Sequence, residues 1–304
     1  MLTGAPCCSY VGVDIGGTRL KLGVVSEAGE VSRVENVPTP GSREDIYDAI
    51  KQYVAQVDGP VAGVGMSMPG VIDATGYSIT AGAIKPLIHR PIKKELSEWL
   101  GLPVFVGNDG RCATVAEGWV GVAQRFTDYV LFTLGTAIGG GIVLDGKLRD
   151  GLGGLAGEFG VALVDIPISD YSKHSFARHA STVAGLCLRY SEQVGEQILD
   201  AREIYRRADA GDKLAQRCIG DFYQAVAVMC INAAVTLAPE ALILGGGISA
   251  NQTAMSEIKD RYQRIISEYH TLGMVRMPKL LIATCRNDAG MIGAVRRLIL
   301  ANNK

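Results

Sequence analysis

Residues 10–25 read Tyr-Val-Gly-Val-Asp-Ile-Gly-Gly-Thr-Arg-Leu-Lys-Leu-Gly-Val-Val, and this stretch decides the fold class of the chain. Residues 10–15 are mostly apolar and strand-like, a Gly-Gly-Thr turn follows them, and residues 20–25 form the returning strand. Glycine at such a turn lets backbone N–H groups approach an anion with no side chain in between. Because these glycines open a strand and not a helix, the Rossmann and Walker phosphate motifs are both missing. The stretch predicts a phosphate-binding hairpin at the start of an α/β fold.

The same pattern returns later in the chain. Residues 129–134 form a predicted strand, residues 135–136 form a Gly-Thr turn, and residues 138–144 form the returning strand. The two turns begin at Gly16 and Gly135, which are 119 positions apart. This recurrence suggests an internal duplication, and chance recurrence in a chain with 38 glycines is the alternative.

Strands alternate with helices along the rest of the chain, which is the pattern of an α/β protein. Further strands are predicted at residues 31–37, 61–68, 102–106, 241–244 and 280–284, and helices at about 43–57, 111–120, 212–237, 253–269 and 289–300. Ser42 is the expected N-cap of the first of these helices. We expect an N-terminal lobe over residues 1–119, with residues 289–304 packing back on it, and a larger C-terminal lobe over residues 120–288.

Composition indicates the class of protein and its compartment. The 304 residues carry 30 basic and 31 acidic side chains, a net charge of −1, so no bulk field attracts nucleic acid or an anionic membrane. The longest apolar runs look strand-sized, and no basic segment precedes an apolar one at the N-terminus, so we expect neither a membrane span nor a signal peptide. Seven scattered cysteines without a Cys-x-x-Cys pair favour a reducing compartment. These features predict a cytoplasmic protein.

Carboxylates at two predicted strand ends are candidates for phosphoryl-transfer chemistry, which needs a held magnesium ion and a base beside the attacking hydroxyl. Asp14 precedes the first glycine turn, where it could support Mg²⁺, and Asp109 follows a strand and precedes a helix. The carboxyl ends of strands are where open α/β sheets bind ligands. The alternative for Asn108 and Asp109 is that Asn-Asp-Gly is only a turn and a helix cap.

A series of motifs between residues 11 and 297 resembles the ROK family of repressors, open reading frames and kinases. In chain order the motifs are Asp14-Ile15-Gly16-Gly17-Thr18, Pro69-Gly70-Val71-Ile72-Asp73, Asn108-Asp109, Leu134-Gly135-Thr136-Ala137-Ile138-Gly139-Gly140-Gly141, Gly157-Glu158-Phe159-Gly160, Leu244-Gly245-Gly246-Gly247-Ile248 and Ala289-Gly290-Met291-Ile292-Gly293-Ala294. The resemblance implies an actin-like ATPase fold, a duplicated ribonuclease H-like architecture with a cleft between two lobes that close over ATP and a sugar. It also implies a kinase that is often a homodimer.

The resemblance also implies roles for single positions. Asp109 matches the family's catalytic base, and Glu158 resembles the family Glu that binds ring hydroxyls of the acceptor. From its position beside Asp109, Asn108 could hydrogen-bond a sugar hydroxyl, and Gly70 could contact the sugar through its backbone. Mg²⁺ would accompany ATP near Asp14. The first two glycine clusters would hold the ATP phosphates and the third would line adenosine, and the residues concerned are Asp14, Gly16, Gly17, Thr18, Gly135, Thr136, Gly245, Gly246 and Gly247.

The chain departs from the family where relatives bind zinc. Many relatives carry a His shortly after the Gly-Glu motif and then Cys-x-Cys-Gly-x-x-Gly-Cys, whereas Val161 takes the His position and residues 162–186 contain no Cys. We therefore expect no structural zinc and interpret His174 and His179 as surface or loop residues. Other departures are Ala137 for Gly, Ala177 near an acceptor-binding Glu, Gly107 for Glu and Arg111 for Asn.

These losses predict a wider acceptor pocket at the anomeric end of the sugar. Zinc-free members with Gly-Glu-Phe-Gly include the β-glucoside kinases, which phosphorylate the 6-hydroxyl of β-glucosides such as cellobiose, and this chain resembles them most. Tyr171 or Phe176 could instead refill the space. The alternatives are a glucokinase, fructokinase or N-acetylmannosamine kinase, and a sugar-sensing regulatory protein. A DNA-binding member needs a helix-turn-helix module of about 60–80 residues before the first glycine turn, where this chain has only about ten.

Overall fold

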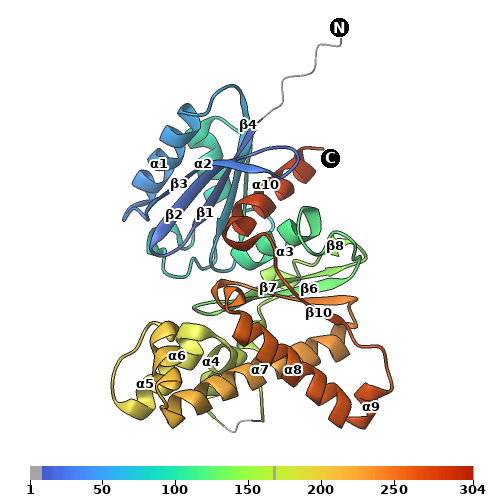
Figure 1. The fold of residues 1–304 in the computed structure, drawn as a ribbon. Helices are drawn as coiled ribbons and strands as arrows, with labels where there is room; N and C mark the ends of the chain where they lie inside the picture. Colours follow the sequence, from blue (N-terminus) through green and yellow to red (C-terminus); the bar gives the residue numbers. More distant parts are fainter. Residues whose placement is uncertain (1–8, 167–168, 304) are drawn as a thin grey trace. The chain divides into compact units, whose positions relative to one another are not determined.

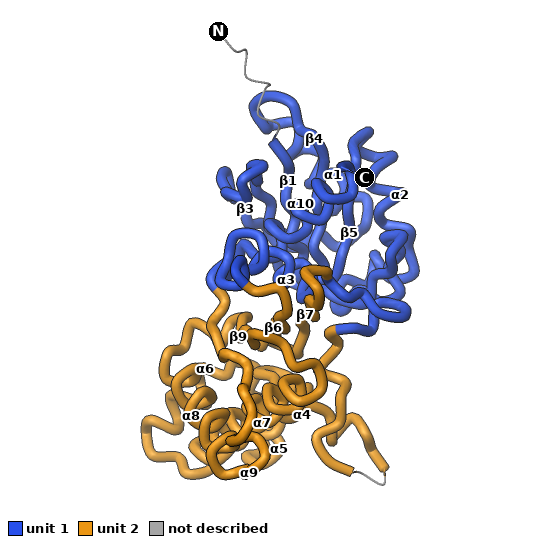
Figure 2. The backbone as a smooth tube through the Cα atoms, turned by 90° about the vertical axis from the view of Figure 1, so that its right-hand side faces the viewer, with its two compact units in different colours: residues 1–125, 148–156, 284–304 blue, residues 126–147, 157–283 orange. Residues whose placement is uncertain are grey.

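The computed structural model describes residues 9–166 and 169–303, which form two compact units (Figure 2). Unit 1 comprises Met1–Arg125, Leu148–Ala156 and Thr284–Lys304, and unit 2 comprises Phe126–Lys147 and Gly157–Ala283. The chain therefore passes from one unit to the other after residues 125, 147, 156 and 283.

Unit 1 is built on a five-stranded mixed sheet with the order β3-β2-β1-β4-β5 (Figure 1). The strands are β1 (Ser9–Ile15), β2 (Arg19–Val25), β3 (Val31–Pro38), β4 (Val61–Met68) and β5 (Val104–Asn108). The first three strands form an antiparallel meander, whereas β4 and β5 run parallel to β1. Asp14 on β1 lies opposite Ser67 on β4, and Met68 lies opposite Asn108 on β5. The carboxyl ends of three parallel strands thus meet at one edge of the sheet.

Helices cover both faces of this sheet. On one face, α1 (Arg43–Ala55) and α2 (Ile92–Leu100) bury side chains against alternate residues of β1, and this core includes Val11, Val13, Ile15, Ile46, Ile50 and Leu96. The side chain of Ser42 accepts a hydrogen bond from the Asp45 N–H, which confirms the predicted N-cap of α1. On the other face, α3 (Asp109–Trp119) and α10 (Ala289–Asn302) pack together. The core between α10 and the sheet includes Met291, Val295 and Leu298 of α10 and Tyr10 and Val25 of the sheet.

Glycines allow α10 to lie close to the sheet and to α3. A Cβ at Gly65 of β4 would come within 2.5 Å of the Ala294 carbonyl carbon. A Cβ at Gly293 would lie 1.7 Å from the Cys112 carbonyl oxygen of α3. The Ala-Gly-Met-Ile-Gly-Ala motif is therefore a packing motif that holds the end of the chain against the sheet formed by its beginning.

Unit 2 repeats the topology of unit 1. Its sheet has the order β10-β9-β6-β7-β8, and the strands are β6 (Tyr129–Leu134), β7 (Ile138–Leu144), β8 (Lys147–Leu148), β9 (Ala241–Gly245) and β10 (Lys279–Ile282). β6 pairs antiparallel with β7 and parallel with β9, as β1 does with β2 and β4. The repeated strand–turn–strand pattern of the sequence is thus confirmed as a repeated topology, and the α/β class with two sheets is confirmed with it.

Helix α7 (Lys213–Leu237) is the central helix of unit 2 and packs against α8 (Gln252–Glu268). The shorter helical segments are α4 (Phe176–Ala180), a π-helical turn (Thr182–Cys187), α5 (Leu188–Val194), α6 (Ala201–Asp209) and α9 (His270–Gly273). The expectation that apolar runs are only strand-sized was wrong, because α7 is long and apolar enough to cross a bilayer. Its apolar window is 61% buried inside the protein, and Phe222, Val226 and Cys230 are fully buried. It therefore serves as a core helix.

The boundaries of the units differ from the lobes expected from the sequence. The units change at residues 125 and 284, against expected boundaries of 119 and 288, and Leu148–Ala156 belongs to unit 1. Two arginines of unit 1 explain the place of this segment. Arg111 donates to the Gly154 carbonyl at 2.6 Å, and Arg297 donates to Asp150 at 3.3 Å. Long-range contacts of this kind have no signature in the local sequence.

Candidate active site

The first glycine turn is closed by backbone hydrogen bonds and held from one side. The Gly16 N–H donates to the Arg19 carbonyl at 2.8 Å, and the Thr39 hydroxyl donates to the Gly16 carbonyl at 2.7 Å. Gly17 and Thr18 are exposed, and the Thr18 hydroxyl makes no hydrogen bond to another described residue. The turn therefore presents backbone and a hydroxyl donor to solvent, as a phosphate site requires.

Asp14 precedes this turn and is half-buried. The Ser67 hydroxyl donates to Asp14 Oδ1 at 2.8 Å, and Oδ2 makes no hydrogen bond within the described part of the chain. Burial raises the pKa of Asp14, and the bond from Ser67 and the nearby charge of Lys21 only partly oppose that rise. Lys21 is held in turn by Asp288, whose Oδ1 accepts from Nζ at 2.7 Å. A carboxylate with an open oxygen at a strand end is a suitable hard ligand for Mg²⁺.

The carbonyl groups of the second glycine turn accept hydrogen bonds from the π-helical turn Thr182–Cys187. Thr182 donates to the Gly135 carbonyl from its backbone N–H at 2.9 Å and from its hydroxyl at 2.6 Å, and the Ala184 N–H donates to the Thr136 carbonyl at 2.9 Å. No described atom lies within 4 Å of where a Cβ at Gly135 would stand, and the φ of Gly135 is not positive. Neither packing nor backbone conformation requires glycine there, so open space next to the turn is what the glycine supplies.

The third glycine cluster lies against the strand that ends in the second turn. Gly246 has a φ of 83°, and a Cβ on it would come within 2.4 Å of the Leu134 carbonyl oxygen. Leu134 directly precedes Gly135, so two of the predicted ATP-binding elements are brought together within unit 2. Gly245 is buried at the end of β9, whereas Gly247 is exposed with no atom within 4 Å of its Cβ position.

The Asn108–Asp109 pair stands where β5 ends and α3 begins. Asn108 is 5% exposed, and its Oδ1 accepts from the Arg111 N–H at 3.0 Å while its Nδ2 donates to the Gly70 carbonyl at 3.0 Å. Asn108 is thus the N-cap of α3, as the alternative interpretation held, and its role in binding sugar stays a prediction. Asp109 is exposed in the first turn of α3 and accepts from the Gly110 N–H at 2.8 Å. The N-cap hydrogen bond of α3 is therefore made by Asn108 and not by the Asp109 carboxylate.

Gly70 is required by the loop that follows β4. Its φ is 100°, and a Cβ there would come within 2.1 Å of the Thr80 carbonyl oxygen. Its own carbonyl is held by Asn108, so the loop and the start of α3 are fixed to each other. A backbone contact of Gly70 with sugar stays a prediction.

Glu158 lies in unit 2, directly before a 3-10 turn (Phe159–Val161). Phe159 packs on Phe132 with ring centroids 4.5 Å apart, and a Cβ at Gly157 would meet the Gly140 carbonyl at 2.7 Å. These contacts fix the Gly-Glu-Phe-Gly motif to β6 and β7 and leave the Glu158 side chain half-buried. Glu158 is described here within unit 2 only, whereas Asn108 and Asp109 belong to unit 1.

The residues at the departures from the family have their own partners. His174 Nδ1 lies 2.8 Å from Asp165 Oδ1, and His179 Nε2 lies 3.0 Å from the Lys173 carbonyl. In residues 9–166 and 169–303, no three His, Cys, Asp or Glu side chains are grouped as metal ligands. Val161 is 68% exposed, and of the two aromatic residues considered as fillers, Tyr171 is 59% exposed and Phe176 is buried in the core of unit 2.

Sequence reasoning missed Ser67 and Lys21. Both lie next to Asp14, Ser67 across the parallel pair with β4 and Lys21 across the antiparallel pair with β2. Ser67 is the single polar residue in the apolar strand Val61–Met68, and that contrast was the available signal. For Lys21 the hairpin register would have been needed.

Comparison with known proteins agrees with this fold and these motifs. Residues 10–301 match the ROK family. The β-glucoside kinase of Listeria monocytogenes serovar 1/2a is 32% identical over 295 residues, which cover 96% of this chain and 97% of that protein. A ROK family protein of Streptococcus pneumoniae in complex with sucrose has a TM-score of 0.87 at 26% identity, with 97% of this chain and 99% of that chain covered. A ROK family glucokinase of Streptomyces griseus in complex with glucose and AMPPNP has a TM-score of 0.79 at 29% identity, with coverages of 95% and 98%.

The family match covers nearly the whole chain, and the order of its motifs is the order expected from the sequence. The folds that the chain resembles are those of kinases with two lobes of the actin-like ATPase type. This chain therefore belongs to the ROK family and is a sugar kinase of that family.

Proposed function

We propose that this protein transfers the γ-phosphoryl group of ATP to the 6-hydroxyl of a hexose or a β-glucoside such as cellobiose. The observation that carries the proposal is the clustering of polar side chains at the carboxyl edge of the unit 1 sheet. Asp14 ends β1, Ser67 lies opposite it near the end of β4, and Asn108 and Asp109 follow at the end of β5. This is the edge at which an open α/β sheet binds ligands.

Asp109 is the proposed catalytic base. The oxygen of the acceptor hydroxyl forms a bond to the γ-phosphorus, the bond from that phosphorus to the β–γ bridging oxygen breaks, and the hydroxyl proton passes to the Asp109 carboxylate. ADP carries away the bridging oxygen. The exposure of Asp109 in the first turn of α3 supports this role, because the carboxylate can reach an incoming hydroxyl.

The glycine clusters are proposed to bind ATP. Gly16, Gly17, Thr18, Gly135 and Thr136 would hold the phosphates, and Gly245, Gly246 and Gly247 would line adenosine. Asp14 would support the Mg²⁺ that accompanies ATP and neutralises charge on the phosphates. The open space at Gly135 and Gly247 supports this assignment, as does the AMPPNP bound by the Streptomyces griseus glucokinase.

The acceptor class is proposed from the relatives and from the departures at the zinc positions. The Listeria β-glucoside kinase favours a glycoside, and the glucose bound by the Streptomyces griseus enzyme makes a glucokinase the second candidate. Glu158, Asn108 and Gly70 would orient the sugar. We further propose a cytoplasmic homodimer, since the five cysteines that the structure describes are unpaired, which favours a reducing compartment, and family members are often dimers.

Coupled ADP release tests the proposal. The purified chain is assayed with glucose, cellobiose, fructose and N-acetylmannosamine, with and without Mg²⁺, and we expect turnover only with Mg²⁺ and the best kcat/KM with a β-glucoside. A strong preference for free glucose would move the protein to the glucokinases.

The Asp109→Asn variant tests the base. We expect kcat to fall by about 10²–10⁴-fold, the usual contribution of general base catalysis, with the melting temperature unchanged because the side chain is exposed. Asp58→Asn is the matched control, since Asp58 is also exposed and its ion pair within the described residues is the surface pair with Arg33. Full activity in Asp109→Asn would remove Asp109 from the chemistry.

A further inference from the structure

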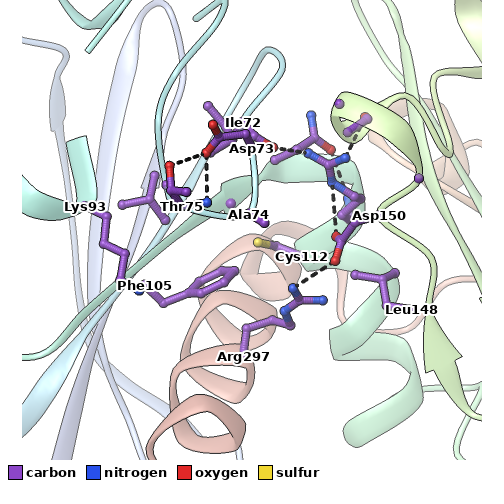
Figure 3. A pocket seen from close by; sticks show the side chains of 18 residues that line it. Ile72, Asp73, Ala74, Thr75, Lys93, Phe105, Cys112, Leu148, Asp150 and Arg297 are labelled. Atoms are coloured by element: carbon purple, nitrogen blue, oxygen red, sulfur yellow. Dashed lines mark hydrogen bonds and ion pairs between the residues drawn. The ribbon is translucent and has the colours of Figure 1, made fainter. Parts of the chain in front are cut away.

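A cavity of about 290 Å³ lies within unit 1, and the proposed reaction assigns no function to it (Figure 3). β5 and the start of α3 form one wall, residues 72–76 form a second, and residues 148–154 form a third. Lys93 of α2 and Arg297 of α10 complete the lining. Asn108 lines the cavity and Asp109 does not, so the cavity adjoins the proposed acceptor site and leaves out the proposed catalytic base.

The cavity carries more positive than negative charge. Three of its lining side chains are cationic and two are acidic. The buried Arg111 donates to the carbonyls of Gly154 at 2.6 Å and Ile72 at 3.0 Å, and its Nε lies 4.0 Å from Asp150 Oδ1. Arg297 donates to the same carboxylate at 3.3 Å. One carboxylate therefore serves two guanidinium groups, which leaves donors and charge for an anion.

The third cation is Lys93, whose backbone N–H donates to the Gly76 carbonyl at 3.3 Å, while its ammonium group makes no hydrogen bond or ion pair to a residue that the structure describes. Figure 3 shows it on the opposite side of the cavity from Asp150 and Arg297. The backbone of Gly76 lies against the stem of Lys93, since a Cβ at Gly76 would come within 2.4 Å of Lys93 Cβ. An anion in the cavity would thus find cations on two sides.

Other lining groups suit the hydroxyls and carbon face of a sugar. Asp73 Oδ1 accepts from the Thr75 N–H at 2.8 Å and hydroxyl at 2.6 Å, and its second oxygen makes no hydrogen bond to a described residue. The Phe105 ring offers an apolar face beneath Arg297, whose guanidinium carbon lies 5.3 Å from the ring centroid. Burial raises the pKa of the Cys112 thiol to about 12, so this group stays neutral and offers no thiolate for a metal or a nucleophilic reaction.

We propose that this cavity is a second ligand site that binds a sugar phosphate and regulates the enzyme. The phosphate would lie between Lys93 and Arg297, where charge-assisted hydrogen bonds are strong. The sugar hydroxyls would donate to the carboxylates of Asp73 and Asp150, and the ring would lie on Phe105. The proposed site follows from the residues that line the cavity, and it does not depend on which acceptor the enzyme phosphorylates.

Hydrogen bonds link this site to the proposed active site. Arg111 holds the Ile72 carbonyl through its guanidinium and donates its backbone N–H to Asn108 Oδ1. Asn108 holds the Gly70 carbonyl and directly precedes Asp109. A ligand that binds Arg297 and Asp150 therefore restrains the groups that fix the start of α3. We expect bound sugar phosphate to change kcat with little change in the KM for either substrate.

Isothermal titration calorimetry on the full chain tests the site. Glucose 6-phosphate, inorganic phosphate and glucose are titrated separately, each with the best acceptor sugar present at saturation so that the acceptor position is filled. We expect glucose 6-phosphate to bind about tenfold or more tightly than inorganic phosphate or glucose. Lys93→Met and Arg297→Met should each weaken its binding by about tenfold or more, because each removes a charge-assisted contact. Lys94→Met is the matched control, since Lys94 is the next residue of α2 and does not line the cavity.

Three results would overturn the proposal. Binding that is lost at saturating acceptor would place the sugar phosphate in the acceptor position as a product. Unchanged binding in Lys93→Met would remove the cavity as the site, and this variant breaks no side-chain hydrogen bond or ion pair among the described residues. Equal affinity for inorganic phosphate would show that no sugar is recognised. Asp109→Asn should bind glucose 6-phosphate normally, which separates failure of this site from failure of the proposed catalytic base.

Discussion

The burial of the ionised Asp14 side chain lowers the stability of the folded chain. Asp14 is half-buried beside Ser67, and burial outweighs the help of Ser67 and Lys21, so its pKa is raised above the ordinary value of 3.8. Between that value and the raised one the folded chain binds more protons than the unfolded chain, so this group lowers stability as pH rises through the window. Above the window the full cost remains. A residue kept at such a cost is a candidate for function.

We predict that Asp14→Asn raises the melting temperature at pH 7 and removes the Mg²⁺-dependent kinase activity. Asparagine keeps an oxygen to accept the Ser67 hydroxyl at its present 2.8 Å and carries no charge to desolvate. The gain should shrink as pH falls through the raised pKa towards 3.8, because the folded chain then takes up the proton before the unfolded chain does. Differential scanning calorimetry from pH 4 to pH 8 measures this. A variant that is less stable than the parent at pH 7 would contradict it, and Asp58→Asn serves as the exposed control.

At the residue scale the sequence identified where polar groups stand but not what they already bind. Asp14 and Asp109 could be found from their places at strand ends. That both polar atoms of Asn108 are engaged, by Arg111 and Gly70, depends on a loop 38 residues away in the sequence. No local pattern encodes such a bond.

Helix α3 holds two remote segments of unit 1 through one buried carboxylate. Glu117 Oε1 accepts from the N–H groups of Thr284 at 2.8 Å and Cys285 at 2.7 Å, and Oε2 accepts from the Val122 N–H at 2.9 Å. Glu117 is fully buried, whereas Thr284 is exposed and Val122 and Cys285 are half-buried. The held segments adjoin two of the points where the chain passes between units, after residue 125 and before residue 284.

We predict that Glu117→Ala lowers the free energy of unfolding by about 3 kcal/mol, because three backbone hydrogen bonds to a carboxylate are lost and each such bond contributes about 1.5–3 kcal/mol. Hydrogen exchange of the Val122, Thr284 and Cys285 amides should accelerate, and Glu117→Gln should show a smaller effect since it keeps one acceptor oxygen. Glu27→Ala, on an exposed turn, should change neither the amides nor the melting temperature. Slow exchange of all three amides in Glu117→Ala would show that other contacts hold them.

The glycines of α10 and α7 allow a paired test of helix packing. A Cβ at Gly293 of α10 would stand 1.7 Å from a backbone oxygen of α3, whereas at Gly220 of α7 the nearest atom is the end of Arg261 at 3.9 Å. Gly293→Ala should therefore destabilise by about 1–3 kcal/mol through overpacking. Gly220→Ala should stabilise by about 0.5–1 kcal/mol, because alanine loses less backbone entropy in a helix. Thermal unfolding of both variants checks the opposite signs, and two changes of the same sign would contradict the packing argument.

Elements with strong periodicity could be predicted, and those defined by tertiary contacts could not. The strands of both hairpins and helix α7 were found from alternation, glycine turns and apolar spacing. The segment Leu148–Ala156, which Arg111 and Arg297 hold in unit 1, carries no periodic pattern of its own. The short helices between residues 171 and 209 were not predicted either, because most of them are brief. In α6 the apolar residues 201, 204, 205 and 208 do follow helical spacing, so the sequence carried a signal for that helix.

For the whole molecule, the repeated topology sets a glycine turn at the same place in each unit. The turn after Asp14 joins β1 to β2, and the turn after Leu134 joins β6 to β7, with the strands paired alike. The turns at the other ends of β2 and β7 are ordinary hairpin turns around Gly29 and Gly146, both with positive φ. Gly135 thus stands in open space, whereas a Cβ at Gly17 would come within 2.7 Å of Ala83 Cβ, and Gly29 and Gly146 supply a positive φ. The offset of 119 residues in the sequence allowed this correspondence to be predicted, while the extent of each unit required the structure.

We predict that AMP-PNP with Mg²⁺ slows backbone hydrogen exchange in residues 14–18 and in residues 135–137 together. Both segments present N–H groups that a bound triphosphate would engage, and engagement of a backbone amide reduces its exchange. The hairpin turns around Gly29 and Gly146 lie at the opposite ends of their strands and should exchange at the same rate with and without nucleotide. Mass spectrometry of the exchanged peptides measures all four segments in one experiment. Protection of residues 14–18 alone would mean that the turn in unit 2 repeats the topology of the first turn but binds no phosphate.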